Sequence, residues 1–260
     1  MIFPVVLGQI EMRGLEENHL FFALQNIQST NFNSFLKSIS ANYPYLVERL
    51  RPKEWEEKHG LRAEFPKEEV SYDQREHALK TKFKFELPER LLETWNGIQE
   101  VKPVIKIETH LRLKSGLIEI YLPINYWYNI IIDRIGHVLS YYLTGDPLKF
   151  RRVKFEEAHL DGWINWRMFK ELRSARFKEV QKGNLRNVYF NGVQLTEDPD
   201  YKAYRKNRFG RLHAISFLAE ISPEKIMAVS INGDKGKITV YSDDPTNIEY
   251  IIHRAEELLT

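Results

Sequence analysis

The sequence has 260 residues and a net charge of +2, and its 43% hydrophobic and 28% charged residues are typical of a folded chain rather than a disordered one. It contains no cysteine, which excludes disulfides, thiolate catalysis and cysteine-ligated metal sites. No apolar run approaches the ~20 residues that span a bilayer, so we expect a cytoplasmic protein with no membrane partner.

The first hundred residues contain the patterns of both strands and helices. Apolar residues recur at helical spacing between positions 32 and 39, whereas apolar and charged residues alternate from 81 to 87 as in a half-buried strand. Residues 53–80 are mostly charged and have little periodicity, which predicts a solvated insert. The elements expected here are strands at Ile2–Ile10, His19–Gln25 and Thr81–Leu87, and helices starting near Asn31, Tyr43 and Pro88, the last running to Trp95.

A β-hairpin followed by a helix is predicted in the middle of the chain. Val104–Leu113 and Leu117–Leu122 flank a short turn that contains Gly116, and a helix is expected from Tyr126 to Thr144. The first strand alternates apolar residues with a charged set that includes His110 and Glu108. These two could meet one ligand, but we favour an exposed ladder of charges along that face.

The last part of the chain is predicted to begin at Asp146-Pro147, which breaks the preceding helix. Within the helix expected from Asp161 to Lys182, Arg173 and Arg176 fall among apolar positions. Such arginines usually snorkel or pair with a carboxylate, and facing a ligand is the alternative. The other elements expected are strands at Leu148–Phe155, Asn187–Phe190, Leu212–Ile221, Ile226–Asn232 and Lys237–Ser242, and a helix at Pro245–Leu259.

These elements predict an α+β fold with two lobes of mostly antiparallel strands, packed helices, and a central β-hairpin plus helix. Residues 1–100 would form one α+β lobe, residues 101–145 a linker-like hairpin and helix, and residues 146–260 a basic second lobe.

No catalytic motif is found. The eight histidines are scattered without metal-ligand spacing, and no glycine-rich loop of the phosphate-binding kind occurs. Paired acids such as Asp243-Asp244 lie beside a proline, where helix caps and turns are common, although a dispersed acidic site remains an alternative. We therefore expect a protein that is not an enzyme, with no catalytic residues, no metal and no cofactor.

Positive charge is concentrated in one part of the chain. Sixteen Lys and Arg face nine Asp and Glu between Asp146 and Arg211, a local charge of +7 against −5 for the remainder. Within this part, Tyr201–Arg211 combines five cations with three aromatic rings, the chemistry that phosphates and stacked bases require. The alternative is a solvated loop whose rings pack onto the core. The predicted nucleic-acid-binding residues are Lys202, Tyr204, Arg205, Lys206, Arg208, Phe209, Arg211, Arg151, Arg152, Lys154, Arg173 and Arg176.

In its organisation the chain resembles the accessory subunits, called N-L1-L2 or APAZ-like, that pair with short prokaryotic Argonautes. The resemblance rests on the strand-rich opening through Leu87, the hairpin and helix at Val104–Thr144, and the basic lobe that follows without a PAZ-sized insert. It implies a non-catalytic subunit that binds an Argonaute-like MID-PIWI protein and helps form the basic channel for a guide and a target strand, DNA or RNA, in prokaryotic defence. The resemblance assigns no individual residue.

Two other functions fit the sequence. One is a small-molecule sensor or enzyme with a pocket between the lobes, in which the basic residues would serve an anionic metabolite. The other is a ferredoxin-like RNA-binding protein of a CRISPR-type complex, because the last strands and helix follow the order of half such a unit.

Overall fold

The computed structural model describes residues 2–12, 32–51, 63–64, 71–74, 77–86, 90–94, 97–101, 104–122, 128–181, 185–244 and 246–259. Contacts divide the chain into two compact units. The N-terminal unit is Gly8–Arg151, and the C-terminal unit combines Met1–Leu7 with Arg152–Thr260. The first strand, β1 (Ile2–Ile10), is therefore divided between them. The division into residues 1–100, 101–145 and 146–260 that we expected from the sequence stays a prediction.

The C-terminal unit is built on an antiparallel sheet. Its strand order is β11-β10-β12-β13-β14-β1. The strands other than β1 are β10 (Phe169–Lys178), β11 (Asn187–Asn191), β12 (Arg211–Ser222), β13 (Lys225–Asn232) and β14 (Lys237–Tyr241). In β13 the buried residues Met227, Val229 and Ile231 alternate with half-buried small ones, so one face of the sheet is apolar and the other polar.

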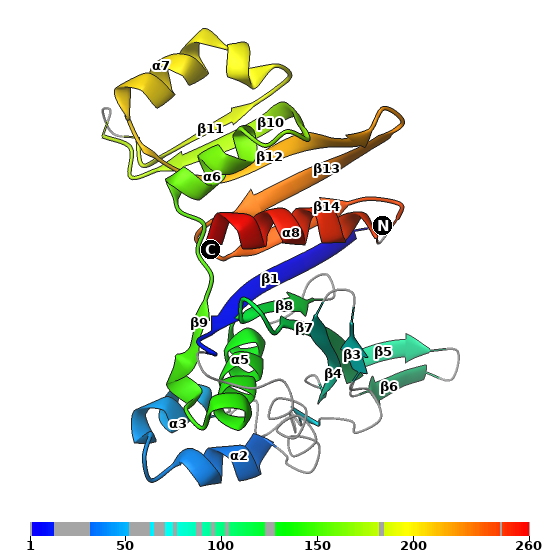
Figure 1. Cartoon of the computed structure of the whole chain (residues 1–260). Helices are drawn as coiled ribbons and strands as arrows, with labels where there is room; N and C mark the ends of the chain where they lie inside the picture. The colour runs from blue at the N-terminus through cyan, green and yellow to red at the C-terminus, as the bar shows by residue number, and fades with distance from the viewer. Residues whose placement is uncertain are drawn as a thin grey trace. The chain divides into compact units, whose positions relative to one another are not determined.

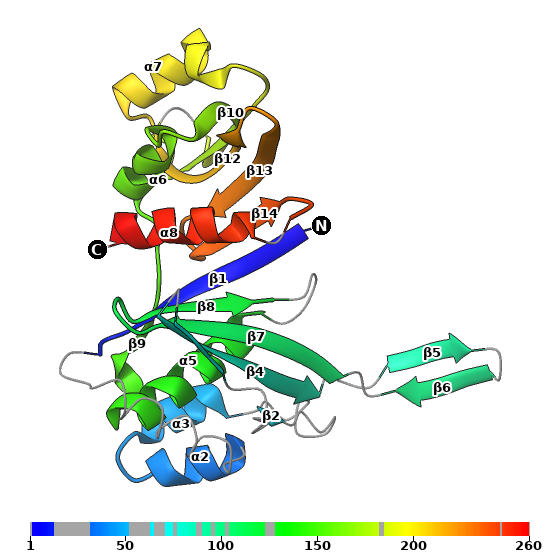
Figure 2. The same cartoon turned by 45° about the vertical axis from the view of Figure 1, so that its right-hand side comes forward.

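Three helices pack on the apolar face of this sheet: α6 (Glu157–Ile164), α7 (Pro199–Asn207) and α8 (Asn247–Leu259) (Figures 1 and 2). Trp163 of α6 lies 6.0 Å from Phe217 of β12, measured between ring centroids. Tyr204 of α7 lies 5.5 Å from Phe177 of β10. Arg254 of α8 donates to the carbonyl of Gly162 in α6. The core of the unit therefore lies between these helices and one face of the sheet.

The helix predicted at Asp161–Lys182 is wrong over most of its length, because α6 ends at Ile164 and residues 169–178 form β10. The pairing of β10 with β12 contains register shifts, including one between Leu172 and Ser174 and one between Arg176 and Phe177. Such bulges change the spacing at which apolar residues return to the same face of a strand. Leu172, Ala175 and Phe177 are all fully buried, and their uneven spacing imitates a helix.

The N-terminal unit contains the other strands of the same twelve-stranded sheet, and we call this part the N-terminal sheet. Its order is β1-β8-β7-β4-β2; β3 also pairs with β4, and β9 pairs with β1. The strands are β2 (Ala63–Glu64), β3 (Ser71–Asp73), β4 (Ala78–Glu86), β7 (Val104–Arg112), β8 (Leu117–Tyr121) and β9 (Phe150–Arg152), with β5 (Arg90–Thr94) and β6 (Gly97–Val101) as a separate hairpin. The fold class is α+β, as predicted.

The helices of this unit are α2 (Phe32–Ile39), α3 (Pro44–Leu50) and α5 (Tyr128–Thr144). Phe35 of α2 lies 5.7 Å from Tyr141 of α5, and Arg134 of α5 donates to the carbonyl of Leu50. Short 3-10 helices occur at η2 (Pro147–Lys149) and, in the C-terminal unit, at η3 (Leu195–Glu197). The predicted helices near Asn31 and Tyr43, the central hairpin and its following helix are confirmed.

Three predictions in the N-terminal unit are wrong. The helix expected at Pro88–Trp95 is the strand β5, paired with β6. The sequence Asn96-Gly97, whose glycine begins β6, is a strong hairpin signal that the helix prediction overlooked. The described residues of the expected 53–80 insert include β2, β3 and the start of β4. The strand expected at Leu148–Phe155 is reduced to β9 after η2. The strand predicted at His19–Gln25 lies outside the described residues.

Candidate nucleic-acid interface

The polar face of the C-terminal sheet is the best candidate for a binding surface. The helices described in this unit all pack on the apolar face, and we call the other side the open face. Cross-strand pairs place its side chains in rows that run across β11, β10, β12, β13 and β14. Its members include Ser174, Arg176, Lys178, Asn187, Tyr189, Asn191, Arg211, Ala214, Ser216, Leu218, Ala228, Ser230, Asn232, Lys237, Thr239 and Tyr241.

The middle of the open face consists of small hydroxyl side chains. Ser174 pairs with Ser216, Ser216 with Ser230, and Ser230 with Thr239. The Oγ atoms of Ser174 and Ser216 are 2.6 Å apart and share a hydrogen bond. Because these side chains are short and polar, a flat ligand could approach the sheet backbone closely and still find hydrogen-bond partners.

Tyrosines border this row on both sides. Tyr189 of β11 is 54% exposed and Tyr241 of β14 is 45% exposed. Arg176 pairs with Tyr189 across the strands, and its guanidinium carbon lies 4.9 Å from the centre of the Tyr189 ring. This cation–π contact aligns a charged plane with an aromatic plane at an exposed position. Both groups can stack on a nucleic-acid base.

Cations gather at one end of the open face around a single carboxylate. Asp234, in the turn between β13 and β14, accepts from Lys178 at 2.7 Å and from Arg211 at 3.1 Å. Burial raises the pKa of Asp234, but the bonds from Lys178 and Arg211 outweigh burial and lower it. His213 lies 3.3 Å from Asp234; burial and the neighbouring cations lower the pKa of His213, which favours its neutral form. The carboxylate thus fixes two cations in place.

Two further lysines add charge at this end. Burial and the nearby Lys235 lower the pKa of Lys237, as expected where positive groups crowd together. The chain at Lys154 runs beside the same turn, because the amide of Phe155 donates to the carbonyl of Gly233. The cations therefore outnumber Asp234 and its neighbour Glu179, which pairs with Arg211 at 3.4 Å.

The aromatic rings of the predicted 201–211 segment are placed differently from the expectation. Tyr204 is 8% exposed, and its ring packs against Phe177, Phe190 and Phe209. In this structure the ring holds α7 on the sheet and presents no free face to a base. Tyr204 therefore packs on the core, as the alternative interpretation of the sequence expected. The segment that carries it is a helix and not the loop of that interpretation.

Ion pairs occupy most cations of that segment. Arg205 donates to both Glu157 and Asp161, so it ties α7 to α6. Burial opposes the charge of Arg205, but the two carboxylates prevail, and its pKa is raised. Lys202 pairs with Glu197 at 2.9 Å. Lys206 and Arg208 are exposed.

The predicted site residues do not form a single cluster. Arg176 and Arg211 lie on the open face, whereas Arg173 occupies the bulge of β10 and pairs with Glu171 at 3.0 Å. Arg151 belongs to the N-terminal unit, and Arg152 begins the C-terminal one. The sequence prediction missed Tyr189, Tyr241, Lys178 and Lys237. Alternation along β14 was the available signal for Tyr241, since Ile238 and Val240 are buried between exposed or half-buried neighbours.

No family model matches this chain, and no curated protein matches it significantly. Among the described helices, none is both long and apolar enough to cross a membrane.

The charged face of the N-terminal sheet is a second candidate site, and here the predicted exposed ladder is confirmed at Lys106 and Glu108 but wrong at His110 and Arg112. His110 and Arg112 are buried, and Glu119 of β8 is 0% exposed. Arg112 Nε lies 2.6 Å from Glu119, and the Tyr121 hydroxyl donates to the same carboxylate at 2.5 Å. Glu108 lies 2.8 Å from His110. We call these five residues the buried ion-pair network.

The groups of this network stabilise one another's charged forms. Burial lowers the pKa of His110, but the bonds to Glu108 and Glu119 outweigh burial and raise it to about 9. Burial raises the pKa of Glu119, but the interactions with His110, Arg112 and Tyr121 outweigh burial. The pKa of Glu119 is therefore lowered. His110 is therefore a cation at neutral pH and cannot act as a general base. His110 and Glu119 are residue types that bind metals, yet Arg112 beside Glu119 opposes a second positive charge.

Proposed function

We propose that the C-terminal unit binds single-stranded nucleic acid across its open face. The observation that carries the proposal is the exposed pair of Tyr189 and Arg176 beside a row of small hydroxyl residues. On a sheet with an uncovered polar face, exposed aromatic side chains can stack on the unpaired bases of a single strand. The proposed role is binding without catalysis.

On this face the aromatic rings would stack on bases, and the cations would contact phosphates. Base stacking on an aromatic ring contributes about 1–3 kcal/mol per base and tolerates any sequence. Tyr189 and Tyr241 supply two such rings at separate positions. Lys178, Arg211 and Lys237 lie at one end, where they would neutralise phosphates and make binding sensitive to salt. The hydroxyl row would add hydrogen bonds without imposing a sequence.

The resemblance to accessory subunits of short Argonautes extends this proposal to a partner. The chain would bind an Argonaute-like MID-PIWI protein, and its open face would form part of the channel for guide and target strands. Co-expression with such a protein, followed by copurification at moderate salt, tests this part separately. If the chain binds oligonucleotides but does not copurify with the Argonaute-like protein, the proposed partner is wrong and the proposed binding function stands.

Fluorescence anisotropy with short labelled single-stranded DNA and RNA tests the binding itself. In the double variant Arg176→Gln/Tyr189→Ala we expect affinity to fall at least about tenfold, with a smaller slope of log affinity against log salt, because one stacking surface and one cation are lost. Tyr250→Ala is the matched control, since Tyr250 is 47% exposed on α8, on the helical side of the unit.

A second double variant, Lys206→Gln/Arg208→Gln, separates the open face from the end of α7. Both residues are exposed, and neither belongs to the open face. Loss of binding in this variant with full binding in Arg176→Gln/Tyr189→Ala would overturn the assignment to the open face. Absence of salt-sensitive binding by the unmodified protein, alone and with its partner, would overturn the function.

A further inference from the structure

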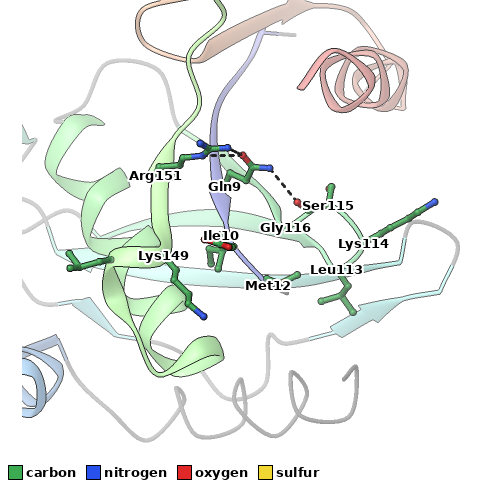
Figure 3. A pocket seen from close by; sticks show the side chains of 11 residues that line it. Gln9, Ile10, Met12, Leu113, Lys114, Ser115, Gly116, Lys149 and Arg151 are labelled. Atoms are coloured by element: carbon green, nitrogen blue, oxygen red, sulfur yellow. Dashed lines mark hydrogen bonds between the residues drawn. The ribbon is translucent and has the colours of Figure 1, made fainter. Parts of the chain in front are cut away.

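A separate pocket lies within the N-terminal unit, outside the open face. Its volume is about 540 Å³, within the ~300–1,000 Å³ typical of small-molecule sites. Three segments form its walls: the end of β1, the turn between β7 and β8, and the chain from η2 into β9 (Figure 3). The lining residues are Gln9, Ile10, Glu11, Met12, Leu113, Lys114, Ser115, Gly116, Leu148, Lys149 and Arg151.

Backbone hydrogen bonds hold these three walls together. The amide of Ile10 donates to the carbonyl of Gly116 at 2.8 Å, and the amide of Glu11 donates to the carbonyl of Lys149 at 3.2 Å. Gly116 has φ +71°, and a Cβ there would lie 2.1 Å from the Ile10 carbonyl oxygen. Only glycine fits this position, so the turn can approach β1 closely. The pocket is therefore built on paired backbone.

Side-chain contacts preset one of its cations. Arg151 donates to the Gln9 side-chain oxygen through Nε at 3.2 Å and Nη2 at 2.7 Å, and the Gln9 amide nitrogen donates to the Ser115 carbonyl at 3.5 Å (Figure 3). Arg151 lies in β9 and Lys149 comes just before this strand; both line the pocket, whereas Phe150 between them is buried. A guanidinium held in this way keeps its other N–H groups available for a ligand.

The lining combines positive charge with an apolar surface. Lys114, Lys149 and Arg151 oppose one acid, Glu11, which favours an anionic ligand. The remaining side chains include Met12, Leu113 and Leu148, which offer an apolar surface to a ring, whereas Ile10 is buried. Inorganic phosphate would leave most of the volume unfilled. A ligand in which an anion is joined to a flat, partly apolar group would contact both the cationic and the apolar lining residues.

We propose that this pocket binds a mononucleotide, with the phosphate held by Lys149 and Arg151 and the base against the apolar wall. Lys114 at the rim adds to the attraction for the phosphate. The site is distinct from the open face and belongs to the other unit, so either proposal can fail without the other.

Calorimetric titration of the full chain with AMP tests the proposal. We expect saturable binding that weakens at least about tenfold in Lys149→Gln and more in Lys149→Gln/Arg151→Gln, because charge-assisted hydrogen bonds to the phosphate are lost. Inorganic phosphate and adenosine should each bind at least about tenfold more weakly than AMP, since each uses one kind of wall. Lys154→Gln, which removes an exposed lysine of the other unit, should bind AMP as the unmodified protein does.

Four outcomes would overturn the proposal. They are the absence of saturable AMP binding, unchanged binding in both pocket variants, equal affinity for inorganic phosphate, and loss of AMP binding in Arg176→Gln/Tyr189→Ala. Thermal unfolding of each variant guards against misfolding. The single variant Lys149→Gln leaves the bond between Arg151 and Gln9 in place, so it keeps the test valid if the double variant is unstable.

Discussion

The charged faces of the two sheets arise from the same kind of sequence and have opposite properties. In the N-terminal unit, Arg112 and His110 close onto Glu119, and the buried ion-pair network satisfies its own charges. In the C-terminal unit, Arg176 lies exposed on Tyr189, and the middle of the face is small and polar. Charged residues on a strand are therefore available to a ligand only where their side chains are exposed to solvent.

Breaking the buried ion-pair network should produce the largest effect on stability. Arg112→Met removes the cation nearest to Glu119 and leaves this buried carboxylate with only His110 and Tyr121, so we expect the free energy of unfolding to fall by about 3–5 kcal/mol. Urea denaturation measures the change. Arg176→Met is the matched control: it removes an exposed arginine of the other sheet and should cost less than about 1 kcal/mol. Equal losses in the two variants would contradict the contrast between the faces.

The pH dependence of stability sharpens the same comparison. The pKa of His110 is raised from 6.5 to about 9 by folding. The stabilisation from its protonated form is therefore complete below about pH 6.5 and is lost as the pH rises through about 9, by up to roughly 3 kcal/mol. Unfolding free energies measured across this range should decline. His110→Gln should flatten the decline, and an unchanged slope in that variant would refute the role of His110.

The link between α7 and α6 should give a smaller effect. Arg205→Gln removes the ion pairs with Glu157 and Asp161, all partly exposed, and we expect a loss of about 1 kcal/mol. Oligonucleotide affinity should stay unchanged, because these bonds already occupy the guanidinium. A stable variant with weakened affinity would return Arg205 to the binding surface, as the sequence alone predicted.

A single change in the hydroxyl row should give an effect of similar size, and a matched double change almost none. Ser174→Ala breaks the hydrogen bond to Ser216 and should cost about 0.5–1.5 kcal/mol, whereas Ser174→Ala/Ser216→Ala removes both partners and should be nearly neutral. A double-mutant cycle by urea denaturation measures the coupling. Additive losses would mean that each hydroxyl finds another partner on the open face.

The sequence predicted elements well where the apolar spacing was regular. The helix α2 buries apolar residues at the expected helical spacing, and the strands β13 and β14 match those predicted at Ile226–Asn232 and Lys237–Ser242. It failed at β10, whose bulges give its apolar residues uneven spacing. It also failed at β5, where Pro88 suggested a helix while Asn96-Gly97 favoured a turn.

The candidate site was harder to predict because charge counts ignore distant partners. Arg205 is paired with acids 44 and 48 residues earlier in the chain. Tyr204 packs on rings of β10 and β11, which no local pattern reveals. Conversely, Tyr189 and Arg176 are thirteen positions apart and meet only because β10 and β11 pair in one register. Prediction of this site therefore needed the strand pairing first.

Strand β1 has a consequence for the order in which the chain can fold. Its first residues pair with β14, so that Ile2 lies opposite Tyr241 and Val6 opposite Lys237. On the ribosome, β1 is made long before β14, and until the two strands pair, this edge of β1 lacks its partner, which invites aggregation. Contacts so distant in sequence also predict slow folding. A fragment that starts at Arg152 would lack this strand, so studies of the C-terminal unit should keep residues 2–7, for example by circular permutation.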